Sequence, residues 1–201
     1  MDDQASDGLR RVLRAVVALN LAYFGIEFGV ALGIGSVSLF ADSVDFLEDA
    51  FLNILVLGAI GWTAVRRARL GMVLAAVLLV PAAATLWTIW IKLGSPLAPD
   101  PLRLSLTGAG ALAVNYACAF MLARYRAHGG SLTRAAFLSA RNDVVANIAI
   151  VAAGLVTSLA WRSAWPDLIV GVGIMILIAD AAREVWERAR AEHADASSAR
   201  A

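Results

Sequence analysis

Long apolar runs make up most of the chain, and short polar links separate them. Several runs are apolar on all sides, whereas a helix on the surface of a soluble protein keeps a polar face. About 20 apolar residues in a helix cross the hydrocarbon core of a membrane, so each run is long enough for one span. The pattern predicts six spans, over about residues 12–34, 38–64, 70–91, 102–123, 133–160 and 166–182.

The links contain residues that end or begin helices. Gly35 in "GIGS" indicates a tight turn between the first two spans, and "KLGSPLAPDP" contains three prolines that prevent a continuous helix. Gly129 and Gly130 interrupt the chain before the fifth span, and Pro166 suits the first turn of the sixth. We therefore expect an all-α membrane protein built as a six-transmembrane-helix bundle.

Arginines gather on alternate links, which predicts how the chain is oriented. Because arginine and lysine are retained on the cytoplasmic side of a membrane, both termini should be cytoplasmic. The expected organisation is a polar N-terminal segment over 1–10, a six-span transmembrane domain over 11–183 and a short charged tail over 184–201, too short for a second domain. The arginines on the predicted cytoplasmic side are Arg10, Arg11, Arg14, Arg66, Arg67, Arg69, Arg124, Arg126, Arg134, Arg183, Arg188 and Arg190, against Lys92, Arg103 and Arg162 on the other.

Composition supports this class and excludes others. Hydrophobic residues make up 60% of the 201 residues, and the mean hydropathy of +0.73 lies outside the range of ordinary soluble domains. A net charge of +1 and the lack of a long basic tract argue against a nucleic-acid partner. A single cysteine, Cys118, excludes an intrachain disulfide and a thiolate metal cluster. We expect a multi-pass protein of a bacterial inner (plasma) membrane, surrounded by membrane lipid.

The second predicted span contains four acids, in the stretch "SVSLFADSVDFLEDAFLN". At about 100° per residue, Asp42, Asp45 and Asp49 fall within about 60° of one another on one helix face, and Glu48 lies about 100° from Asp49. Carboxylates inside a membrane persist where a cation, protons or a water-filled cavity compensates their charge. Two structural alternatives remain: Asp42 caps the start of the span, and Glu48 pairs with an arginine of a neighbouring span.

The fifth span offers a matching polar stripe in "FLSARNDVVANIAI". Ser139, Asp143 and Asn147 follow one another at four-residue intervals and share one side of the helix. The Asp–x3–Asp and Ser–x3–Asp spacings allow two side chains from each helix to converge on one ion. Alternatively, Ser139 bonds only to a backbone carbonyl, and Asn142 has a structural or gating role. Glu27 in the first span is a candidate proton site or outer-gate acid.

Two of these stretches resemble the signatures of the cation diffusion facilitator family. "SLFADSVDFLEDA" is similar to the second-span signature, in which an Ala-Asp pair precedes a His/Asp–x3–Asp metal pair. "SARNDVVAN" is similar to the fifth-span signature, a His/Asp–x3–Asp pair followed by Val and then Asn. The resemblance implies a homodimeric exporter that exchanges a divalent transition metal for protons by alternating access. It implies a metal site made by Asp45, Asp49 and Asp143, with Ser139 where the family has His or Asp.

Two departures from the family pattern shape the expected chemistry. Ser139 is a poor ligand, so water, Asn142 or Asp42 would complete the ligand shell, and an all-oxygen set leans toward manganese or iron rather than zinc. Zn, Mn, Fe, Co, Ni and Cd all remain open as the transported ion. The cytoplasmic metal-binding domain of many members is not expected here, so dimerisation would rest on the spans.

The expected role is transport, with the metal as substrate, no prosthetic group and no enzymatic activity. Clustered aspartates would hold protons until a dication displaces them, which makes binding and release depend on pH. Asp42, Glu27 and Asn142 are candidates for a secondary metal site or for proton coupling. One alternative is a transport-inactive protein that binds or senses metal. Another is an intramembrane aspartyl hydrolase, although the stretch lacks the glycine-containing motif of such enzymes and three stripe acids exceed the two that this chemistry requires.

Overall fold

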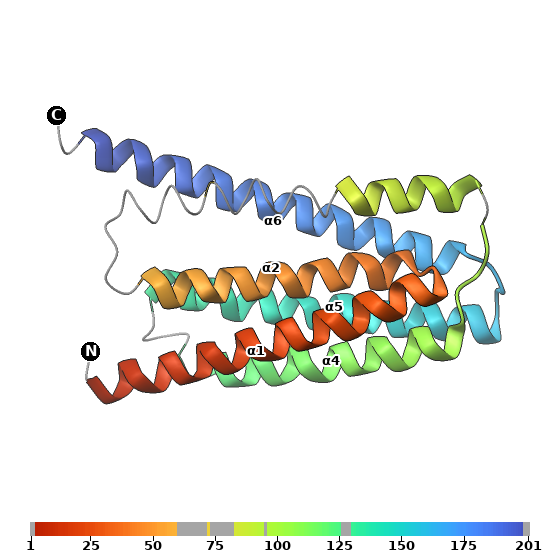
Figure 1. Ribbon diagram of the computed structural model, residues 1–201, viewed down its shortest axis with the longest axis horizontal. Coiled ribbons are helices and arrows are strands. Elements are labelled where there is room, and N and C mark those ends of the chain that lie inside the picture. The colour runs from red at the N-terminus through yellow and green to blue at the C-terminus, as the bar shows by residue number, and fades with distance from the viewer. Residues whose placement is uncertain (1–2, 60–71, 73–82, 95, 126–129, 199–201) are drawn as a thin grey trace.

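Five long helices and one shorter helical segment make up the part of the chain that the structure describes. The computed structural model describes residues 3–59, 72, 83–94, 96–125 and 130–198. The long helices are α1 (Asp3–Ile34), α2 (Val37–Ala59), α4 (Pro101–Ala123), α5 (Gly130–Leu159) and α6 (Trp165–Ser198), and residues 83–94 form the shorter segment. Figure 1 shows α1 beginning and α6 ending at the same end of the bundle. The prediction of an all-helical bundle is confirmed.

The helix boundaries agree with the sequence pattern where the structure describes both. The predicted spans over 12–34, 102–123 and 133–160 coincide with the apolar parts of α1, α4 and α5. The last helix is longer than its span, because α6 continues through the charged residues to Ser198. The end of the second predicted span, 60–64, lies outside the described residues, as does the third span apart from 72 and 83–91.

Local sequence accounts for several helix ends. Asp100 has an extended backbone and accepts a hydrogen bond on Oδ1 from the backbone N of Arg103 at 2.9 Å, and Pro101 occupies the first turn of α4. Gly35 adopts a φ of 63° in the turn between α1 and α2, a backbone region that glycine enters without steric cost. These two features set where α4 begins and where the chain reverses after α1.

Helix α2 occupies the interior of the bundle, in contact with α1, α5 and α6 (Figure 1). Two clusters of buried apolar side chains flank its centre. One includes Phe40 and Val44 of α2 with Ile174 of α6, and the other includes Val56 of α2 with Leu122 of α4. Asp45, Glu48 and Asp49 lie along the chain between these clusters, and Asp42 lies within the first, so packing holds their backbone from both ends.

The outer surface of the bundle is apolar. Large side chains such as Leu32, Phe120 and Leu159 are 62%, 74% and 82% exposed, which is typical of a surface that lipid covers. Within the described residues, α1 over Asp7–Ile34 and α4 are long and apolar enough to cross a membrane, and Asp143–Leu159 is a shorter apolar helix. The fold therefore combines a lipid-compatible exterior with an acidic interior.

Candidate functional site

The acids of α2 point into the bundle. Asp42, Glu48 and Asp49 are at most 3% exposed, and Asp45 is partly buried. Glu48 is buried although it lies off the common face of the aspartates, because α2 is covered by neighbouring helices on several sides. Both Glu48 carboxylate oxygens lack a hydrogen-bond partner among the described residues, and no ion pair with an arginine is found there. The pairing alternative for Glu48 therefore has no support in the described part of the chain.

Asp45 and Asp143 join α2 to α5. Their carboxyl groups lie within hydrogen-bonding reach of each other, and Asp49 and Asp42 are close enough to act electrostatically on Asp143. Asp143 is 7% exposed, and its Oδ2 has no donor among the described residues. Two carboxylates are both acceptors, so a hydrogen bond between them requires a proton on one of them. The arrangement can therefore hold one proton, or exchange it for a cation.

Glu27 and Asp42 form a second carboxyl pair, which joins α1 to α2. Both residues are fully buried, and none of their four carboxyl oxygens has a hydrogen-bond donor among the described residues. The two carboxyl groups lie near each other, and Asp45 lies near enough to act electrostatically on both. Tyr23 lies beside this pair and donates its hydroxyl to the backbone O of Thr107 at 2.6 Å, which ties α1 to α4. Asp42 is thus an interior acid rather than the cap of α2.

Two asparagines follow the acids at the same spacing on both helices. Asn53 donates Nδ2 to the backbone O of Asp49, and Asn147 donates Nδ2 to the backbone O of Asp143, each at 2.7 Å. Both amide oxygens are buried and have no partner among the described residues. Asn53 was not among the predicted site residues, although the Asp–x3–Asn spacing is repeated in the sequences of α2 and α5.

Not every predicted site residue is described to the same extent. Ser139 and Asn142 lie within the helical backbone of α5, but their side chains lie outside what the structure describes. Among the side chains that it does describe, no three from histidine, cysteine, aspartate or glutamate are grouped so that they could hold a metal ion. The described acids thus form contacting pairs rather than a closed set of three ligands.

Asp167 is a buried acid with a different role, which the sequence did not reveal. It accepts hydrogen bonds from Ser36 Oγ and Ser38 Oγ at 2.6 Å each, and from the backbone N of Val37 at 2.9 Å and of Ser38 at 3.1 Å. Lys92 Nζ lies 3.2 Å from Asp167 Oδ2 and also donates to the backbone O of Gly35. Asp167 therefore caps α2 from the first turn of α6. This is the role that one interpretation of the sequence assigned to Asp42. Two features of the sequence could have indicated this capping contact: the acid in the first turn of the last span, and the Ser–x–Ser that follows Gly35.

Cys118 is buried, as the sequence suggested, and its Sγ lies 3.6 Å from Asn20 Oδ1. This contact joins α4 to α1 at the cluster that contains Leu13 and Leu122. The thiol is thus part of the α1–α4 contact.

Comparison with known proteins gives the family. No curated protein matches the sequence. Residues 13–190 match the family described as the cation efflux transmembrane domain, which covers all six predicted spans and nearly the whole chain. Proteins of this family are membrane-embedded transporters of metal cations rather than enzymes. The family match and the acid-bearing signatures of α2 and α5 agree, and we conclude that the chain belongs to the cation efflux family.

Proposed function

We propose that this protein exports a divalent transition-metal ion from the cytoplasm in exchange for protons. The observation that supports this most is the contact between the carboxyl groups of Asp45 and Asp143 across α2 and α5, with buried Asp49 close by. Paired carboxyls inside a membrane helix bundle are costly unless protons or a cation neutralise them. A site that must hold one or the other is suited to exchanging them.

The proposed metal site consists of Asp45, Asp49, Asp143 and Ser139. Without metal, the Asp45–Asp143 pair shares a proton. A dication that enters the site replaces this proton, because carboxylates coordinate metal in their ionised form. Since the described acids are grouped in pairs, we propose that the ion draws Asp49 toward Asp143 as it binds.

Glu27 and Asp42 are proposed to couple the metal site to protons. Their contact lies between α1 and α2, and Asp45 is within electrostatic range of both, so the charge state of one pair affects the other. A dication bound at Asp45 would favour the ionised form of the neighbouring pair. Loss of that proton when metal binds, and its return when metal leaves, would link the two flows. Asn142 is a further candidate for the edge of this site.

The atoms available to coordinate a metal ion are mainly oxygens, which favours harder ions such as manganese or iron over zinc. The buried amide oxygens of Asn53 and Asn147, which have no partner among the described residues, add to this oxygen character. We further propose that the end that carries both termini is cytoplasmic, that the protein lies in a bacterial inner membrane and that it works as a homodimer held by its spans.

The test is metal flux in proteoliposomes that contain the purified protein. Manganese, iron, zinc, cobalt, nickel and cadmium are offered with and without an imposed pH gradient. We expect flux that rises with the gradient in the wild type and is lost in Asp45→Asn. Asp180→Asn, which changes an exposed acid of α6, is the matched control and should retain flux. Unchanged flux in Asp45→Asn would overturn the proposed site, and metal binding without flux in the wild type would overturn transport.

A further inference from the structure

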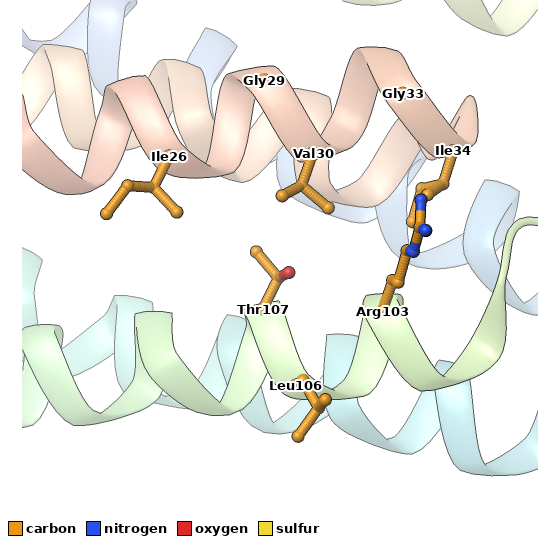
Figure 2. Close-up of a pocket in the computed structure, with 8 residues that line it drawn as sticks. All are labelled: Ile26, Gly29, Val30, Gly33, Ile34, Arg103, Leu106 and Thr107. Atoms are coloured by element: carbon orange, nitrogen blue, oxygen red, sulfur yellow. The ribbon is translucent and has the colours of Figure 1, made fainter.

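A groove of about 560 Å³ lies between α1 and α4, near the end of the bundle where α1 ends and α4 begins (Figure 2). Gly29, Val30 and Gly33 line it from α1, and Arg103, Leu106 and Thr107 line it from α4. The volume is within the range of about 300–1,000 Å³ that is usual for small-molecule sites. The groove differs in chemistry from the acidic interior, since none of its described lining residues is an acid.

Glycines on α1 create the space. Gly29 and Gly33 are four residues apart and therefore lie on the same face, and a Cβ added at either would meet no atom within 4 Å. Small residues at this spacing allow another molecule to approach a membrane helix closely. Ile26 and Leu106 at the rim are 57% and 64% exposed, so the groove opens onto the surface that faces lipid.

Arg103 supplies a positive charge at one end of the groove. Figure 2 shows its side chain extending from α4 toward Ile34 of α1. Arg103 is exposed, and among the described residues its guanidinium has no ion pair or hydrogen bond. Asp100 accepts a hydrogen bond from the backbone N of Arg103, not from its side chain. Arg103 lies two residues after the start of α4 at Pro101, which is the depth at which a span meets the lipid headgroups.

We propose that this groove binds one anionic phospholipid from the leaflet at this end of the bundle. The acyl chain would lie along Gly29 and Gly33, and the phosphate would pair with Arg103. The charge of the site and its place between two spans fit this occupant, because a guanidinium group pairs strongly with a phosphate.

A second copy of the chain fits the groove less well. A copy that packed its own α1 onto Gly29 and Gly33 would cover the Arg103 guanidinium with an apolar surface, at a large desolvation cost. It would bring no counter-charge, because the only acid in 12–34 is Glu27, which is fully buried on the inner side of α1. An anionic headgroup supplies that charge and remains in contact with water.

The test is native mass spectrometry of the full chain, purified in detergent and titrated with phosphatidylglycerol or phosphatidylcholine. We expect one tightly retained phosphatidylglycerol in the wild type and about a fivefold loss of its affinity in Arg103→Ala. Arg162→Ala is the matched control, because Arg162 is exposed at the same end but does not line the groove. Gly29→Leu fills the groove and should weaken retention of both lipids, whereas Gly25→Leu, on the same face outside the groove, should not.

Three results would overturn the proposal. The first is phosphatidylglycerol affinity that is unchanged in Arg103→Ala, and the second is an equal loss in Arg162→Ala. The third is lipid binding that persists in Gly29→Leu while a dimer becomes a monomer, which would assign the groove to a second copy. Helix content and elution volume of each variant show that it is folded. Metal flux is not the readout, so the lipid site and the proposed transport can fail separately.

Discussion

Lys92 and Asp167 form a buried ion pair, with Nζ 3.2 Å from Oδ2, although they are 75 residues apart in the chain. Lys92 lies in the last turn of the helical segment over 83–94, and Asp167 lies in the first turn of α6. Because Asp167 also accepts four hydrogen bonds from 36–38, this pair joins three helices at one end of the bundle.

The two partners of this pair should contribute unequally to stability. Asp167→Ala leaves Lys92 buried without its carboxylate and removes the cap of α2, so we expect the free energy of unfolding to fall by about 3–5 kcal/mol. Lys92→Met should cost clearly less, because Asp167 keeps its four other donors. Thermal unfolding in detergent measures both, and Asp100→Ala, which removes an exposed cap, should cost about 1 kcal/mol. Equal losses in the two partner variants would show that the cap is unimportant.

Asn147 should influence metal binding without being needed for folding. Its Nδ2 bonds to the backbone O of Asp143, and its buried Oδ1 is unpartnered within the described residues. We expect Asn147→Ala to lower metal affinity by about 10–100-fold, as loss of a supporting residue around a metal site does. Thr157→Ala is the control, because Thr157 is also buried in α5 and bonds to the backbone O four residues earlier. An equal effect of both variants would indicate a general change in α5.

Glu27 should affect coupling more than binding. If the Glu27–Asp42 pair carries the exchanged proton, Glu27→Gln removes one titrating carboxyl while preserving the shape of the side chain. We expect metal affinity to change by only a few fold, while flux loses its dependence on a pH gradient. In the wild type, affinity should fall as pH falls, because protons compete with metal for the carboxylates. Flux in Glu27→Gln that still follows the gradient would remove Glu27 from the coupling.

The sequence predicts the parts of this molecule that depend on local patterns. The common face of Asp42, Asp45 and Asp49 follows from helix geometry, and the turn at Gly35 and the start of α4 at Pro101 follow from residue type. Asp143 could be predicted to share a site with the acids of α2, because it belongs to a second polar stripe on another span.

Contacts that depend on how helices are rotated and placed could not be predicted in this way. The ion pair of Lys92 and Asp167 joins links that are distant in sequence, and each residue alone looked like an ordinary charge at a span end. The burial of Glu48 depends on neighbours that cover more than one face of α2. The contact of Glu27 with Asp42 depends on the relative rotation of α1 and α2, which periodicity does not fix.

The central claim is that acids of α2 and α5 share one ion, and equilibrium binding of manganese to the purified protein tests it most directly. The measurement compares the wild type with Asp45→Asn, Asp143→Asn and the double variant, and checks that each variant is folded. Residues that hold the same ion lose affinity non-additively. We expect either single change to remove most of the binding and the double change to add little. Full binding in Asp143→Asn, or losses that simply add, would contradict a shared site.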